Sequence, residues 1–406
     1  MAEIKVPFHR AAITKAEEDA VLDVLRSGWL TTGKYALEFE KKFSAAVSVG
    51  DEAAGRAPVI SLAVNSNTSG MILAMEACGV REGTAIITTP YTFVSTAACA
   101  RHLNADVYFA DVEKDTYSID PIKIEEILKK DTEGRVRAIV PVHIAGNVCD
   151  MPRIMELARK YSTPQRRIRV IEDAAHSFPS PTALGYAGTI GDAGVFSFYV
   201  TKTITTAEGG MVCTRDPELA RRMTVMRMHG MDRTTWDRYT SPRASWEYDI
   251  IAPGYKFNLP DVLAALGCCQ VDRAQIFYEQ RKRIVEKYNK AFADLDFIKL
   301  PPDGEGNSWH LYLMRIVPEK LKITRDEFAK KMQEAGLGIS VHFIPIFHFT
   351  YWRELYPDFT AENYPNAERQ YNTTISIPLF PDMTDEQAQL VIDTVTKIGN
   401  ENRSNS

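Results

Sequence analysis

Cysteine is scarce in this sequence and never takes the paired spacing that binds metals. The 406 residues include six cysteines, none of which forms a Cys-x-x-Cys pair. This usage disfavours both a disulfide framework and a zinc site, so we expect no bound metal. Most of the cysteines lie in apolar runs, which indicates buried free thiols in a reducing cytoplasm.

Long apolar runs and excess positive charge are also missing. No run approaches the roughly 20 apolar residues that cross a bilayer, and the first residues lack the apolar core of a signal peptide. The net charge of −5 argues against a nucleic-acid-binding face. No Gly-x-Gly-x-x-Gly motif follows a strand, which weakens the hypothesis of a dinucleotide-binding dehydrogenase. We therefore expect a cytoplasmic protein with no membrane span and no nucleic-acid partner.

The first two thirds of the chain alternate between apolar strands and helical segments. Strands are predicted at Pro58–Val64, Thr84–Thr89, Asp106–Asp111 and Arg137–His143, with helical patterns between them. Alternation at this spacing predicts an α/β domain with a mostly parallel sheet covered by helices on both faces.

The last third has a different pattern. A long helix is predicted from about residue 275 to 295, followed by a strand at 309–317 and a helix at 325–335. The chain is long enough for two domains, and we expect a large domain at 1–262 and a smaller α+β domain at 263–406.

One lysine stands out because of its surroundings. Lys202 follows an apolar strand within the stretch Asp192–Met211 and lies in a run of threonines with almost no other charge. Desolvation of such a lysine would lower its pKa and expose a nucleophilic amine, as a Schiff-base lysine requires. The alternative is an ordinary lysine whose ammonium reaches water.

A carboxylate ends another predicted strand. Arg169–His176 indicates a short buried strand that ends in Asp173. Acids at the carboxyl ends of such strands face the crevice where α/β proteins bind ligands. Pyridoxal phosphate (PLP) requires both groups, a lysine for its aldehyde and a carboxylate for its ring nitrogen. Asp173 taken alone could equally cap a helix.

Two further segments are suited to hold parts of a cofactor. Asn65–Met71 opens a helix, and its hydroxyl and amide groups either cap that helix or bind a phosphate at its N-terminus. Phe93 follows a strand and either stacks on a flat heteroaromatic ring or packs in the core.

Several motifs together resemble one known family. Glu172–His176, Ser197–Lys202 and Thr206–Gly210 are similar to the sugar-nucleotide aminotransferases of the DegT/StrS type, and the resemblance extends from Val6 to Thr384. It implies the PLP-dependent transferase fold of type I, with a mixed sheet of about seven strands, and a homodimer with shared active sites.

The resemblance also implies roles for single residues. Lys202 would bind the PLP aldehyde, Asp173 the pyridine nitrogen and His176 the phenolic oxygen, while Ser197 would contact the phosphate. Phe93 would stack on the ring. The implied cofactor-binding residues are Asn67, Thr68, Ser69, Phe93, Asp173, His176, Ser197, Lys202, Lys256 and Asn258. Asn67 departs from the family pattern, which usually has glycine there.

Lys256 and Asn258 would reach the cofactor phosphate of the neighbouring subunit. Many family members carry other residues at these two positions, and the variant seen here is associated with enzymes that act at carbon 4 of UDP-sugars.

Other segments would face the substrate. The loop Ser27–Gly33, with Trp29, Thr31 and Thr32, matches the mouth of the family's sugar site, and His342 lies in a segment that reaches the active site. Arg238 could hold the carboxylate of an amino-acid donor. The plainer alternatives are a helix-ending turn, a packed strand histidine and a surface arginine.

These observations predict a PLP-dependent aminotransferase, and the resemblance implies that it converts a nucleotide-linked keto-sugar, a UDP-4-keto sugar, with L-glutamate as donor. Such an enzyme would serve amino-sugar and polysaccharide or lipopolysaccharide biosynthesis. The alternatives are a PLP-binding regulator and a dehydratase-like member of the family. Lys202 argues against the dehydratase, which carries histidine at that position, and only about ten residues precede the first predicted helix, too few for a DNA-binding module.

Overall fold

The computed structural model describes residues 3–232 and 247–404. Its largest element is a seven-stranded sheet with the strand order β1-β9-β8-β5-β4-β2-β3. The strands are β1 (Ile60–Val64), β2 (Ala85–Thr88), β3 (Asp106–Phe109), β4 (Val136–Ile139), β5 (Arg169–Asp173), β8 (Ala193–Ser197) and β9 (Gly210–Thr214). Strand β9 is antiparallel to both neighbours, whereas all pairs from β8 to β3 are parallel. The predicted α/β fold with a mostly parallel sheet is confirmed.

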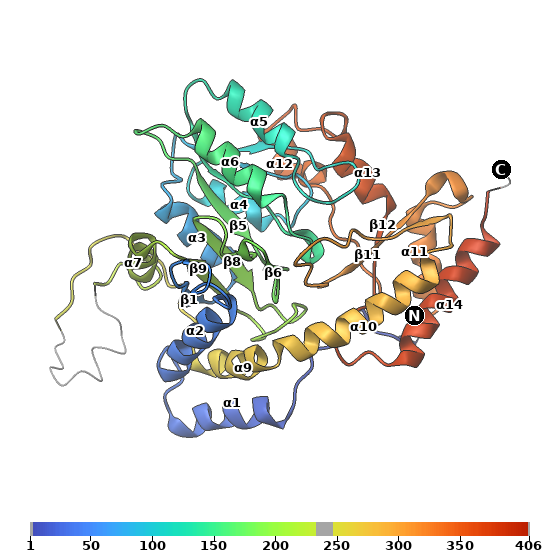
Figure 1. The fold of residues 1–406 in the computed structure, drawn as a ribbon, viewed down its shortest axis with the longest axis horizontal. Helices are drawn as coiled ribbons and strands as arrows, with labels where there is room; N and C mark the ends of the chain where they lie inside the picture. Colours follow the sequence, from blue (N-terminus) through green and yellow to red (C-terminus); the bar gives the residue numbers. More distant parts are fainter. Residues whose placement is uncertain (1–2, 233–246, 405–406) are drawn as a thin grey trace.

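Helices cover both faces of this sheet (Figure 1). One face packs against α3 (Asn67–Ala77), α4 (Ser95–His102) and α7 (Pro217–Met226). The other face packs against α2 (Lys34–Val47), α5 (Pro121–Lys130), α6 (Met151–Tyr161) and α9 (Asp261–Asp272). Helix α1 (Lys15–Ser27) lies outside and contacts α9. The strands are therefore buried from both sides, which explains their nearly continuous apolar sequences.

Helix boundaries follow local capping chemistry. Helix α5 begins at Pro121 because the side chain of Asp120 accepts a hydrogen bond from the N–H of Ile122 at 2.8 Å. Proline suits the first helical position, where its missing N–H would have no partner inside the helix.

A second sheet lies in the C-terminal part of the chain. Its antiparallel strands are β10 (Ile298–Lys299), β11 (Tyr312–Ile316) and β12 (Thr374–Ile377). It shares a core with α10 (Ala274–Phe292), α11 (Arg325–Glu334) and α14 (Asp385–Glu401), and α10 and α14 lie side by side (Figure 1). Helices α12 (Thr350–Leu355) and α13 (Pro365–Thr373) instead join the core of the large sheet. The remaining short elements are β6 (Pro181–Thr182), β7 (Gly185–Tyr186), η1 (Ile144–Gly146), η2 (Pro318–Lys320), η3 (Ile346–His348) and η4 (Ala361–Asn363).

The strand predicted at 309–317 begins later than expected. Trp309 has a φ of 50°, which lies outside the extended region, so β11 starts only at Tyr312. The side chain of Asn307 accepts a hydrogen bond from the Trp309 N–H at 2.9 Å and holds this turn. The turn places His310 just before the strand rather than within it.

All six cysteines are free, and five of them are buried. Burial raises the pKa of Cys78 and of Cys213 to about 12, so these thiols remain protonated. The expectation of buried free thiols is confirmed. Within 3–232 and 247–404, no helix combines the length and the apolar character needed to cross a membrane.

Candidate active site

A cavity of about 340 Å³ opens at the carboxyl ends of β5 and β8. Asp173 is the last residue of β5, and Ser197 is the last residue of β8. Eight of the residues singled out from the sequence line the cavity: Asn67, Thr68, Phe93, Asp173, His176, Ser197, Lys202 and His342. The sheet therefore gathers side chains that are up to 275 positions apart in the chain, from 67 to 342.

Lys202 lies in the turn that follows β8. Its N–H donates to the carbonyl oxygen of Tyr199 at 2.8 Å, which fixes the backbone of the turn. Burial lowers the pKa of the Lys202 amine to about 8, although the carboxylate of Asp173 acts in the opposite direction. At neutral pH roughly a tenth of the amine is therefore uncharged and nucleophilic.

The Asp173 carboxylate is held by three hydrogen bonds. Oδ2 accepts from Thr96 Oγ1 at 2.7 Å, and Oδ1 accepts from the Ala175 N–H at 3.2 Å and from Asn67 Nδ2 at 3.4 Å. Burial raises the pKa of Asp173, whereas these hydrogen bonds and the charge of Lys202 lower it. The carboxylate is thus fixed in direction and faces a cavity that also contains a cation.

The first turn of α3 caps its helix and also borders the cavity. Ser66 caps the helix by accepting from the Ser69 N–H at 3.1 Å, and Ser69 Oγ donates to Asn65 Oδ1 at 2.6 Å. Ser69 is therefore used within the cap and does not line the cavity. Asn67 and Thr68 do line it, and their N–H groups have no helical acceptor because they belong to the first turn.

Three histidines line the cavity together, of which two are buried and the third, His342, is partly buried. His176 Nδ1 accepts from the Ala145 N–H at 3.1 Å, so the proton of its neutral ring lies on Nε2. Burial lowers the pKa of His176 well below its usual value, and it lowers the pKa of His342 to about 4. His342 Nδ1 is 2.8 Å from Ser376 Oγ. The third histidine, His310, was not singled out from the sequence.

Other residues of the site were also not predicted from the sequence. Thr96, which holds Asp173, is one of many threonines and carries no motif. Phe8 and Phe343 line the cavity from opposite ends of the chain, and Phe8 stacks on His342 with ring centroids 5.7 Å apart. No spacing rule links such positions.

A second group of predicted residues lies away from the cavity. Asn258 Nδ2 donates to Thr32 Oγ1 at 2.6 Å, and Thr32 Oγ1 donates to the Leu259 carbonyl at 2.7 Å. Trp29 Nε1 donates to the Thr32 carbonyl at 3.2 Å. We call Trp29, Thr31, Thr32, Lys256 and Asn258 the loop cluster, and none of them lines the cavity.

Lys256 is exposed and hydrogen-bonds to the Asn258 side chain, while the carbonyl of Thr31 accepts from the Asp261 N–H at 3.3 Å. Arg238 lies outside the described residues.

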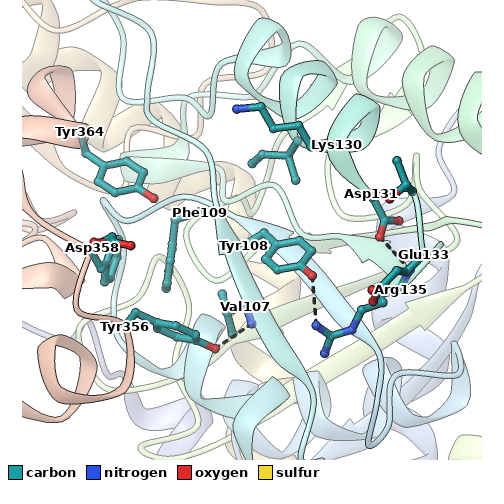
Figure 2. Close-up of a pocket in the computed structure, with 13 residues that line it drawn as sticks. Val107, Tyr108, Phe109, Lys130, Asp131, Glu133, Arg135, Tyr356, Asp358 and Tyr364 are labelled. Atoms are coloured by element: carbon teal, nitrogen blue, oxygen red, sulfur yellow. Dashed lines mark hydrogen bonds between the residues drawn. The ribbon is translucent and has the colours of Figure 1, made fainter.

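A larger cavity of about 480 Å³ lies beside β3, an edge strand of the sheet (Figure 2). In Figure 2 the Val107 N–H donates to the Tyr356 hydroxyl oxygen at 3.1 Å, and Arg135 donates to the Tyr108 hydroxyl oxygen at 3.3 Å. Lys130 is exposed there. The buried carboxylate of this cavity, Asp131, is paired with Arg166 at 2.7 Å and accepts from the Arg135 and Val136 N–H groups, so it serves the structure, and the size of the cavity does not make it the chemical centre.

The residues of the first cavity fit PLP. Lys202 offers an amine of lowered pKa, Asp173 offers a fixed carboxylate for a ring nitrogen, and the first turn of α3 offers N–H groups and the Thr68 hydroxyl to a phosphate. Fold and site together define a PLP-dependent enzyme of fold type I.

Comparisons with known proteins agree with this class. The family description "DegT/DnrJ/EryC1/StrS aminotransferase family" matches residues 11–396, and the chain belongs to this family. The enzyme is therefore a PLP-dependent aminotransferase of the sugar aminotransferase family.

Two sequence relatives cover nearly the whole chain. An uncharacterised protein of Methanocaldococcus jannaschii is 38% identical over 98% of both chains. The spore coat polysaccharide biosynthesis protein SpsC of Bacillus subtilis is 37% identical over 97% of both chains.

Solved structures are similar as well. A Streptococcus pneumoniae protein described as a sugar aminotransferase, in its PMP form, has a TM-score of 0.88 and 29% identity over 98% of this chain and 100% of its own. Helicobacter pylori PseC, an aminotransferase involved in the biosynthesis of pseudoaminic acid, has a TM-score of 0.82 and 26% identity over 98% of this chain and 99% of its own.

Proposed function

We propose that the enzyme transfers an amino group from L-glutamate to the keto group of a nucleotide-linked sugar, with a UDP-linked 4-keto sugar as the substrate. The observation that carries the proposal is the pairing of Lys202, whose amine has a pKa of about 8, with the fixed carboxylate of Asp173 in one cavity. The printed names of SpsC and PseC, which concern polysaccharide and pseudoaminic acid biosynthesis, support a sugar acceptor. The Lys256 and Asn258 variant supports carbon 4 by family resemblance.

Each of these cavity side chains has a separate role in the proposed reaction. PLP, when bound, supplies an aldehyde and an electron-accepting ring. Lys202 Nζ takes a proton from the carbon that bears the donor's amino group and returns one during amination of the sugar, which its lowered pKa permits near neutral pH. Asp173 would hold the ring nitrogen of bound PLP in its protonated state, and Thr96 and Asn67 keep that carboxylate oriented. His176 presents its Nε2 proton to the cavity as a hydrogen-bond donor.

A homodimer would complete the site. Among the described residues that line the cavity, Lys202 is the one lysine or arginine. The phosphates of a cofactor and of a sugar nucleotide favour further cations and hydrogen-bond donors. Lys256 is exposed beside Asn258 on the loop cluster, away from the cavity of its own chain, so these two side chains are available to a second copy. We also propose that the enzyme acts in the cytoplasm, because free cysteines are typical of proteins in a reducing compartment.

The test is an absorbance spectrum of the purified enzyme with PLP. We expect a band near about 410–430 nm that moves to about 330 nm when L-glutamate is added. Keto-sugar nucleotides with UDP, GDP and dTDP are then screened for restoring the first band. Lys202→Ala should abolish the band, whereas Lys330→Ala, at an exposed position on α11, should retain it. Absence of the band in the wild-type enzyme would contradict the proposal. A band that responds to glutamate but to no keto-sugar would favour another acceptor.

Shared sites can be tested by mixing two inactive variants. Lys202→Ala lacks the cavity amine, and Lys256→Ala lacks the exposed lysine of the loop cluster. If each site takes its lysines from two chains, a mixed dimer contains one site with both lysines. Random pairing of equal amounts makes about half of the dimers mixed, so the mixture recovers about a quarter of the wild-type activity. No recovery in a mixture shown to exchange subunits would contradict shared sites.

A further inference from the structure

His310 occupies a fixed position at the junction of the two sheets. Its side chain is 3% exposed and lines the same cavity as Lys202. The buried Arg281 donates through Nη1 to the His310 carbonyl at 3.2 Å and to the Leu379 carbonyl at 3.0 Å. The N–H of the next residue, Leu311, donates to the Ala145 carbonyl at 3.3 Å. The backbone on both sides of the ring is therefore anchored.

Within the part of the chain that the structure describes, the ring nitrogens of His310, in contrast, have no partner. Nδ1 is fully buried and makes no hydrogen bond, and Nε2 makes none within residues 3–232 and 247–404. The other two histidines of the cavity each have a partner for Nδ1, the Ala145 N–H for His176 and the Ser376 hydroxyl for His342. A polar group without a partner leaves a hydrogen bond unmade, and because Nδ1 has no exposed surface, Nε2 is the ring nitrogen to which a ligand in the cavity could supply one.

The surroundings of His310 favour an uncharged partner. Its ring lies against that of His176, with centroids 4.4 Å apart, Arg281 donates to its carbonyl, and Lys202 lines the same cavity. Burial and these neighbours lower the pKa of His310 well below its usual value, so the ring is neutral at physiological pH. A neutral imidazole offers one N–H and one lone pair, which match a hydroxyl or carbonyl oxygen better than a carboxylate.

We propose that His310 binds the keto-sugar, with one ring nitrogen hydrogen-bonded to a hydroxyl or carbonyl oxygen of the sugar. This inference rests on the proposed function, because it takes the second substrate to be a sugar. The amino-acid donor carries a carboxylate, which needs a cation, so His310 takes no part in donor binding. Its loss therefore affects the reaction with the keto-sugar and leaves the reaction with L-glutamate unchanged.

Three substitutions test the role of each nitrogen. His310→Phe keeps a flat ring against His176 but has no hydrogen-bonding group. His310→Asn places an amide near the position of Nδ1, and His310→Gln places one near the position of Nε2. His348→Gln is the matched control, because His348 is paired with Glu368 and does not line the cavity.

The wild-type enzyme and each variant are compared by two readouts. The first is the rate at which L-glutamate converts the band near about 410–430 nm to the band near about 330 nm. The second is the KM for the keto-sugar nucleotide that restores the band in the wild-type enzyme. We expect His310→Phe to raise this KM about tenfold, equivalent to the loss of one hydrogen bond, with an unchanged glutamate rate. We expect one of the Asn and Gln variants, but not both, to restore most of the affinity.

Binding is also measured without turnover, by calorimetry with UDP-N-acetylglucosamine as a sugar nucleotide that carries no keto group. The same order of affinities is expected for the variants. An unchanged keto-sugar KM in His310→Phe would overturn the proposal, and so would an equal slowing of the glutamate reaction. Failure of the proposed function gives a different result, since the wild-type enzyme itself would then show no band or no response to any keto-sugar.

Discussion

The buried amine of Lys202 should make the cofactor-free protein less stable at neutral pH than a variant without it. The unfolded chain exposes this lysine to water, where its pKa is near 10.5, whereas burial lowers the pKa to about 8 in the folded protein. Below pH 8 the amine is protonated in both states, and the folded state bears the full penalty of a desolvated charge. Lys202→Met removes the charge and keeps a flexible apolar side chain of similar length.

The size of the effect follows from the pKa. A decrease from 10.5 to about 8 corresponds to about 3 kcal/mol. The side chain still has some exposed surface towards the cavity, so we expect Lys202→Met to stabilise the cofactor-free protein by about 2–3 kcal/mol at pH 7. As the pH rises from 8 to 10.5, the Lys202 amine loses its proton in the folded protein before it does so in the unfolded chain. The unfolded state then binds more protons, so wild-type stability increases over this range and approaches that of the variant.

Urea denaturation of the cofactor-free protein measures this difference. Wild type and Lys202→Met are compared at pH 7 and pH 10, together with Lys330→Met, which replaces an exposed lysine. We expect a higher urea midpoint for Lys202→Met at pH 7, a smaller difference at pH 10 and no pH-dependent difference for Lys330→Met. A Lys202→Met variant that is no more stable at pH 7, or whose advantage persists at pH 10, would refute the reasoning.

Three other substitutions give measurable outcomes. Thr96→Val removes the 2.7 Å hydrogen bond to Asp173, so it should destabilise the protein by about 1–3 kcal/mol in urea and weaken PLP retention in dialysis. Gly194→Ala places a Cβ 2.1 Å from the Gly188 carbonyl oxygen within the central sheet, and it should lower the urea midpoint by an amount equivalent to about 1–3 kcal/mol. Asp261→Ala removes the carboxylate that accepts from N–H groups at the start of α2 at 2.7 and 2.9 Å, and a loss of about 2–3 kcal/mol should appear in the same assay. Unchanged urea midpoints would contradict each of these expectations.

The parts of the fold that could be predicted are those with a local physical signal. The parallel strands carry nearly continuous apolar residues, and helices between them complete a repeating pattern. A carboxylate or a lysine directly after such a strand must lie at the same edge of the sheet. Asp173 and Lys202 could be associated for this reason, although 29 positions separate them in the sequence.

The parts that could not be predicted depend on contacts between distant segments. The position of His310 is set by the left-handed turn at Trp309, by Arg281 on α10 and by the docking of Leu311 on Ala145. None of these has a periodic or spacing signal. For Ser69 the local sequence was compatible with two roles, a helix cap and a phosphate contact, and could not distinguish them. In the structure the Ser69 hydroxyl takes part in the cap.

Asn67 shows how a departure from the family pattern can have a structural function. Its amide nitrogen donates to the Val195 carbonyl at 2.9 Å and lies 3.4 Å from Asp173 Oδ1, so it links the first turn of α3 to both β8 and the carboxylate. A glycine at this position could make neither contact. The amide therefore helps to orient Asp173 before any cofactor binds, and it does so from a turn that borders the cavity. The ring nitrogen and the phosphate of PLP would thus be positioned by one connected hydrogen-bond network, which joins the first turn of α3 to Asp173, rather than by independent contacts.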